Sequence, residues 1–123
     1  MELIENKDNN SNIINSIDAK SVTINNQSFT ASCIVSNQHT MTEIGINNID
    51  DLNAEIMDYL LSNNPEIIII GSGSNHKFPD IKFLKPIAMN NIGFEVMNNQ
   101  SATRTYNVLI AEERQVSCLL ILE

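Results

Sequence analysis

The residues best suited to chemistry in this chain are a short glycine-containing loop and one arginine further along. Gly71-Ser72-Gly73 directly follows a run of isoleucines. Glycines let the backbone bend sharply and bring bare N–H groups close to an anion. We therefore take Gly71, Ser72, Gly73, Arg104 and Thr105 as candidate ligand-binding or anion-binding residues. The alternative is that the loop is only a tight turn leaving a sheet.

Complete catalytic and nucleotide-binding signatures are missing around this loop. The dinucleotide fingerprint needs a third glycine where the chain has His76, and a phosphate-binding loop needs Gly-Lys-Ser/Thr. A nucleophile elbow needs glycine two residues either side of the serine, but Ser72 has Ile70 and Ser74 there. We assign no catalytic residue and expect that the protein is not an enzyme.

Arg104 has two readings. The spacing of the apolar residues predicts a helix that begins near Ser101, and a cation in its first turn is unfavourable beside the positive end of the helix dipole. An anion bound by Arg104 and the backbone N–H groups of residues 101–103 would compensate for it. The alternative is a structural ion pair with Glu95 or Glu66.

Metal and cofactor chemistry finds little support. The chain has two histidines, His39 and His76, and two cysteines, Cys33 and Cys118, without the close spacing of a metal site. We therefore expect no metal and no cofactor. Both cysteines lie in apolar stretches, which predicts free, buried thiols rather than a disulfide.

Composition limits the partners. Seven Lys and Arg against fifteen Asp and Glu give a net charge of −8, with no basic segment for nucleic acid or anionic lipid. The first residues lack a signal-peptide pattern, and the longest apolar runs are far short of the ~20 residues that span a bilayer. We expect a cytoplasmic protein without membrane insertion, and the oligomeric state stays open.

The chain length of 123 residues suits one domain. Residues 1–15 are polar and without period, which predicts a flexible tail before a single domain over residues 16–123. Alternating apolar residues around 22–24 and 29–35, separated by Asn25-Asn26, predict an antiparallel ribbon with a tight turn. A further strand is expected near 41–46.

From residue 52 onward the pattern alternates between helix and strand. We expect helices over 52–60, 81–88 and 101–112, and strands over 66–70, 94–97 and 116–122. Asn48, Asp50 or Asp51 would cap the first helix, and Pro86 would kink the second or delay its start. The isoleucine run over 67–70 predicts a strand covered on both faces. Such alternation predicts parallel crossovers in an α/β fold.

Four blocks of sequence carry a family resemblance. They are Pro65 to Gly73, Phe78-Pro79, Gly93 to Met97, and Arg104 to Leu109. Their order and spacing resemble the family of NADH dehydrogenase (complex I) assembly factor 3 and the adipogenesis-associated protein. The resemblance covers residues 17–122.

The resemblance implies a three-layer β+α/β/α fold around a mixed five-stranded sheet with one antiparallel strand. It also implies a non-enzymatic role in binding proteins, with components of respiratory complex assembly as the partners. Thr103 stands where many members carry cysteine, which argues against thiol chemistry. Glu113 stands where relatives have glycine, so we expect the last helix to end differently.

Overall fold

The computed structural model describes residues 1–123, which form nine strands, three α-helices and a 3₁₀ turn at Ile49–Asp51. The strands are β1 (Glu2–Glu5), β2 (Ile14–Ile17), β3 (Val22–Ile24), β4 (Gln27–Phe29), β5 (Cys33–Ser36), β6 (His39–Thr42), β7 (Ile67–Gly71), β8 (Gly93–Met97) and β9 (Val116–Leu120). The helices are α1 (Ala54–Ser62), α2 (Ile81–Met89) and α3 (Asn99–Ala111). Strand and helix alternate after residue 52, as the sequence predicts.

The central sheet has six strands in the order β1-β6-β5-β9-β7-β8. β7 pairs in parallel with both β8 and β9, while the pairs β9–β5, β5–β6 and β6–β1 are antiparallel. A second, three-stranded antiparallel sheet contains β2, β3 and β4. The layered α/β class with a preceding ribbon is confirmed. The sheet has one strand more than the resemblance implies, because β1 adds to its edge.

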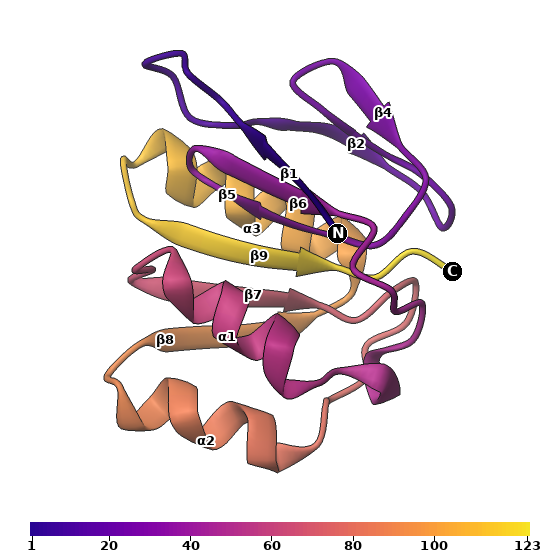
Figure 1. Ribbon diagram of the computed structural model, residues 1–123, viewed down its shortest axis with the longest axis vertical. Coiled ribbons are helices and arrows are strands. Elements are labelled where there is room, and N and C mark those ends of the chain that lie inside the picture. Colours follow the sequence, from indigo (N-terminus) through magenta and orange to yellow (C-terminus); the bar gives the residue numbers. More distant parts are fainter.

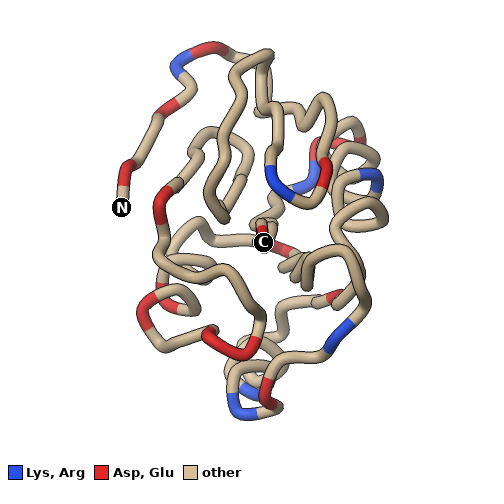
Figure 2. Tube along the Cα trace, turned by 90° about the vertical axis from the view of Figure 1, so that its right-hand side faces the viewer, with Lys and Arg blue, Asp and Glu red and all other residues tan.

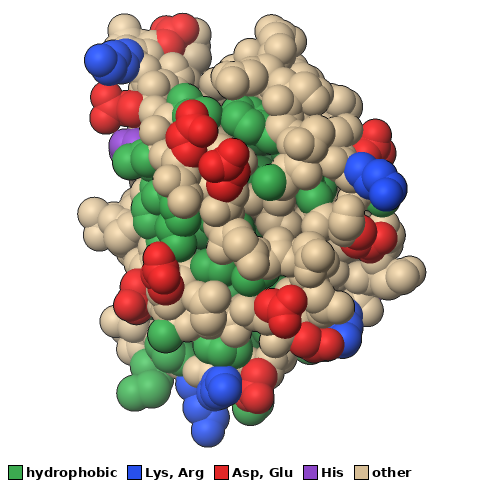
Figure 3. Space-filling model, turned by 45° about the vertical axis from the view of Figure 1, so that its right-hand side comes forward, with side chains coloured by type: hydrophobic (Ala, Val, Ile, Leu, Met, Phe, Trp, Pro, Cys, Tyr) green, Lys and Arg blue, Asp and Glu red, His purple; other side chains and the backbone are tan.

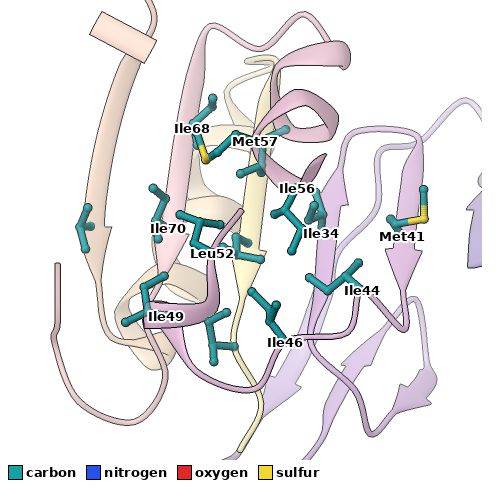
Figure 4. Close-up of a cluster of buried hydrophobic side chains, with 14 of the residues drawn as sticks. Ile34, Met41, Ile44, Ile46, Ile49, Leu52, Ile56, Met57, Ile68 and Ile70 are labelled. Carbon is teal, nitrogen blue, oxygen red and sulfur yellow. The ribbon is translucent and has the colours of Figure 1, made fainter. Parts of the chain in front are cut away.

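Helices and strands cover both faces of the central sheet (Figure 1). α1 and α2 pack on one face, and α3 with the small sheet packs on the other. The side chains of β7 alternate between the two cores: Ile68 and Ile70 point to the α1 side, and Ile69 points to the α3 side. Figure 4 shows Ile56 and Met57 of α1 within the first core. The prediction of a strand buried on both faces is confirmed.

The predicted ribbon corresponds to the β3–β4 hairpin, but the strand expected over 29–35 is divided between β4, which ends at Phe29, and β5 of the central sheet. The strand expected near 41–46 is β6, which ends at Thr42. Asn25 and Asn26 form the turn of the hairpin with φ angles of 48° and 66°. Both lie in the left-handed region, which two-residue hairpin turns need and which Asn tolerates better than other non-glycine residues.

Residues 1–15, predicted as a flexible tail, contain β1 and the start of β2. β1 pairs antiparallel with β6, from Glu2 opposite Thr42 to Glu5 opposite His39. Asn12 is buried, and its Nδ2 donates to the carbonyls of Ser36 (2.9 Å) and His39 (3.2 Å). Strand pairing uses backbone groups, so this segment needs no apolar pattern of its own.

The helix starts differ from prediction. Asn48 caps the 3₁₀ turn, whereas Asn53 caps α1 through a bond from Ile56 N. α3 begins at Asn99, capped by Asn98, so it starts before Ser101. An Asn side chain readily accepts a hydrogen bond from a free N–H group in the first turn of a helix, and several asparagines here could serve as the N-cap.

Two further features of the helices concern Pro86 and the C-terminal end of α3. α2 starts at Ile81, capped by Asp80, and continues through Pro86 without a delayed start. α3 ends where Glu113 adopts a φ of 61°, while the N–H of Arg114 donates to Leu109 O at 3.0 Å. Glu113 thus takes the left-handed conformation that closes many helix C-termini and that glycine adopts most readily.

Candidate functional site

The loop after β7 is held against the start of α3 by Asn99. The Asn99 side chain accepts from Gly73 N (3.1 Å) and donates to Ile121 O (2.7 Å). Its backbone N–H donates to Gly73 O at 2.8 Å. One buried carboxamide therefore ties together the ends of β7 and β9 and the first turn of α3. Asn99 could not be predicted as a site residue from the sequence, because its partners Gly73 and Ile121 lie more than twenty residues away in the chain.

Both loop glycines are required by the geometry. A Cβ atom on Gly71 would lie 2.7 Å from Asn99 Oδ1 and 2.8 Å from Leu119 O. Gly73 has a φ of +106°, which side-chain-bearing residues rarely adopt. These constraints support the tight-turn reading of the loop.

Ser72 is buried and its hydroxyl is fully engaged within the loop. Its Oγ donates to Asn75 O at 2.7 Å and accepts from Lys77 N at 3.0 Å. The nearby His76 uses Nε2 to bond the carbonyl of Val96 at 3.0 Å. Ser72 and His76 therefore serve the loop's own structure and do not bond each other.

A small polar pocket of about 200 Å³ lies beside this loop, at the carboxyl ends of β7 and β9. Its lining includes Ser72, Asn75, Lys77, Asn48 and Glu123. The Glu123 carboxylate accepts from Ser74 N at 3.3 Å. A carboxylate of the chain itself thus occupies a donor that an anion would use.

Arg104 and Thr105 lie on α3, away from this pocket. Arg104 is exposed, does not line the pocket, and donates to Ser101 Oγ at 3.4 Å. Thr105 Oγ1 lies 3.4 Å from Met97 Sδ. Because α3 begins at Asn99, Arg104 is in its second turn, where the dipole is weaker. The structure joins the glycine loop to the start of α3 but does not bring Arg104 into the pocket.

The ion pair suggested for Arg104 does not form. Arg114 takes the Glu66 carboxylate instead, with Nε 3.2 Å from Oε1. The N–H of Gln115 donates to the same carboxylate at 2.8 Å, and this backbone bond is the main cause of the lowered pKa of Glu66. The guanidinium of Arg104 therefore stays without a carboxylate partner. Thr103, its neighbour, has a buried hydroxyl without a hydrogen-bond partner.

The two thiols are buried and free, as predicted. Both lie in the core between the central sheet and α3. Burial raises the pKa of the Cys33 thiol to about 12, and it raises the pKa of Cys118 as well. Neither thiol is a nucleophile at neutral pH.

A larger concavity lies between α1 and α2, on the opposite side of the sheet from α3. Its volume is about 570 Å³. We call it the α1–α2 groove, and it is lined by Leu52, Asn53, Ala54, Met57, Asp58, Leu61, Lys82, Phe83 and Pro86. Most of these side chains are apolar. Sequence reasoning missed the groove, because it depends on how the two helices are spaced on the sheet.

Exposed apolar and basic side chains gather next to this groove. Phe78, Ile81 and Met89 are exposed by 61%, 66% and 82%. Lys82 and Lys85 are exposed among them on α2. Figure 2 places Lys and Arg residues at the lower end of the molecule, where Figure 1 places α2, and Figure 3 shows hydrophobic side chains beside Lys/Arg side chains there. We call Phe78, Ile81, Lys82, Lys85 and Met89 the α2 surface.

None of the three helices has the length and the hydropathy of a membrane-spanning segment.

Comparison with known proteins gives one curated relative and several similar structures. The chain is 36% identical over 76 residues to the "13 kDa major membrane protein" of Francisella tularensis subsp. holarctica (strain LVS). That match spans 62% of each protein. A Xanthomonas campestris protein solved by NMR is 29% identical with a TM-score of 0.79, over 91% of this chain and 85% of that one.

A Bordetella pertussis protein described as a Mth938-like domain shares the fold. It has a TM-score of 0.77 and 20% identity, over 98% of this chain and 92% of that one. The family model for "Protein of unknown function (DUF498/DUF598)" matches residues 14–121. That range runs from β2 through β9 and includes the glycine loop, Asn99 and the α1–α2 groove. The chain therefore belongs to the DUF498/DUF598 family and has a Mth938-like α/β fold.

Proposed function

We propose that this protein is a non-enzymatic binding module that acts through the α2 surface on another protein. The exposure of Phe78, Ile81 and Met89 within one segment carries the proposal. Contiguous exposed apolar patches on a soluble protein often mark a site of protein interaction. Most of α2 faces solvent, with only Ile87 buried, although the helix is rich in apolar residues.

The resemblance to complex I assembly factors supports a finer version of this proposal. In this finer version, the partners are components of a respiratory complex during its assembly. We also propose that the protein acts in the cytoplasm, where a reducing environment suits two free thiols. The name of the Francisella relative describes that protein, and a partner at a membrane would reconcile it with this role.

The test is quantitative affinity capture from a lysate of the source organism. We expect that Phe78→Ser, Ile81→Ser and Met89→Ser together reduce recovery of the specific partners about ten-fold. The control replaces three other exposed apolar residues, Leu3, Ile13 and Val108, by serine. Equal recovery by wild type and the α2 variant would contradict the proposal.

A second candidate function is the binding of an anionic small molecule near Gly71 to Gly73 and Arg104. One observation favours it: the exposed guanidinium of Arg104 has no carboxylate partner. The Glu123 carboxylate bonded to the loop weighs against it. The anion titration in the Discussion tests this candidate.

A further inference from the structure

The α1–α2 groove has an apolar floor. Leu52 and Met57 are buried at its base, and Leu61 and Phe83 are half-buried along it. α1 has one broad apolar stripe. Ile56 and Leu60 face the sheet, and Met57 and Leu61, their neighbours on the helix surface, extend the stripe to the groove. Leu61, at the edge of the stripe, stays partly exposed.

The two walls of the groove carry opposite charges. Asp58 lies on the α1 wall and Lys82 on the α2 wall, and Lys85 lies one turn further on α2. Asp58 and Lys82 do not pair across the groove, since the ion pairs of the molecule join other residues. The Lys82 Nζ lies 5.1 Å from the centre of the Phe83 ring. Charges at the rim of an interface orient a partner that carries the opposite charges at the matching positions.

We propose that the α1–α2 groove binds an amphipathic helix of a partner protein. The partner helix would place apolar side chains on the groove floor, acidic side chains towards Lys82 and Lys85, and a basic side chain towards Asp58. This inference rests on the proposed protein-binding function and adds the form and charge order of the partner. Recognition of this kind reads anchors at i, i+3, i+4 and i+7.

The other occupants fit these observations less well. An anionic bilayer would meet a protein of net charge −8, and two lysines add only about 1 kcal/mol each near such a surface. A second copy of this chain would have to supply an acidic amphipathic helix. Its α1 has acidic residues, but the apolar side of α1 is already buried against its own sheet. A free apolar molecule would use the floor and leave Lys82 and Asp58 without a role.

The experiment displays peptides of about 20 residues, tiled across the proteome of the source organism, and selects those that bind the full-length protein. Enriched peptides should have an amphipathic pattern with acidic residues along one flank. Their affinity should fall about ten-fold on Lys82→Glu with Lys85→Glu, and also on Ala54→Trp, which fills the groove from an exposed position. Lys20→Glu reverses one charge in the turn between β2 and β3 and should leave the affinity unchanged.

A charge swap adds a stricter test. The double variant Lys82→Glu, Lys85→Glu should regain affinity for the same peptides after their acidic flank is replaced by lysine. The inference fails if no peptide is enriched, or if enriched peptides bind the groove variants as well as wild type. It also fails if the variants change only the binding of the protein to anionic vesicles, or only its self-association, and leave peptide binding unchanged.

The two proposals can fail separately. Affinity capture that depends on Phe78, Ile81 and Met89 but not on Ala54→Trp would keep the binding function and remove the helical occupant. Capture that depends on neither would remove both.

Discussion

Asn99 shows how one residue can determine the geometry of the loop that looked most functional. Its carboxamide uses a donor and an acceptor on two different segments, at Ile121 O and Gly73 N. It is buried, so losing either partner would leave a polar group unsatisfied in the core. The close approach of Gly71 to Asn99 follows from this clamp, which gives the glycine loop a structural purpose of its own.

Gly71→Ala tests this clamp. The added Cβ would lie 2.8 Å from the carbonyl oxygen of Leu119, so the variant should lose about 1–3 kcal/mol of unfolding free energy. Gly93→Ala is the matched control, because its nearest neighbour is 3.6 Å away, an ordinary contact. Urea unfolding of the two variants measures the difference. Equal stability of the two would show that the loop gives way and the clamp is loose.

Arg104→Ala tests the anion-binding candidate. If Arg104 and the glycine loop bind an anion, sulfate or phosphate should raise the melting temperature of the wild type more than that of the variant. Chloride at equal ionic strength controls for general salt effects. An identical response of both proteins to these anions would remove this candidate. The geometry around Glu123 favours that second outcome.

At the scale of elements, local patterns predicted some parts well and failed where partners are distant. The isoleucine run of β7 and the Asn25-Asn26 turn contain their own signals, namely β-branched residues buried on both faces and a tolerated left-handed backbone. β1 has no such signal, since its pairing depends on β6, nearly forty residues away. The start of α3 was misplaced, because Asn98 and Ser101 are both good capping residues and only the structure chooses between them.

Two truncations test the role of the N-terminal segment. Removal of residues 1–5 deletes only β1, an exposed edge strand, and should lower the melting temperature by a few degrees at most. Removal of residues 1–12 also deletes Asn12, whose carbonyl accepts from the buried Tyr106 hydroxyl at 2.9 Å. Without Asn12, the buried groups that it bonds lose a hydrogen-bond partner, and the free energy of unfolding should fall by about 1–3 kcal/mol more. Coincident melting curves for both truncations and the full chain would show that the whole segment is dispensable.

At the scale of the whole molecule, the distribution of charge is the informative feature. The chain is acidic overall, yet Lys77, Lys82 and Lys85 make up three of its seven Lys and Arg residues, and they lie in one short segment. Lys77 pairs with Asp50, which leaves Lys82 and Lys85 for external contacts. The sequence revealed the total charge and the apolar content of this segment. The exposure of this segment and the groove beside it could not be predicted from the sequence, because both depend on how α2 packs against the edge of the sheet.

The most direct test of the account is site-specific photo-crosslinking in cells of the source organism. A photo-reactive amino acid at Met89, the most exposed apolar residue of the α2 surface, should give a discrete adduct of higher mass with another protein. The adduct should disappear when Lys82→Glu and Lys85→Glu are added, and the same photo-reactive residue at Lys20 should give none. An absence of adducts from Met89, or equal adducts from Met89 and Lys20, would contradict a protein-binding role for the α2 surface.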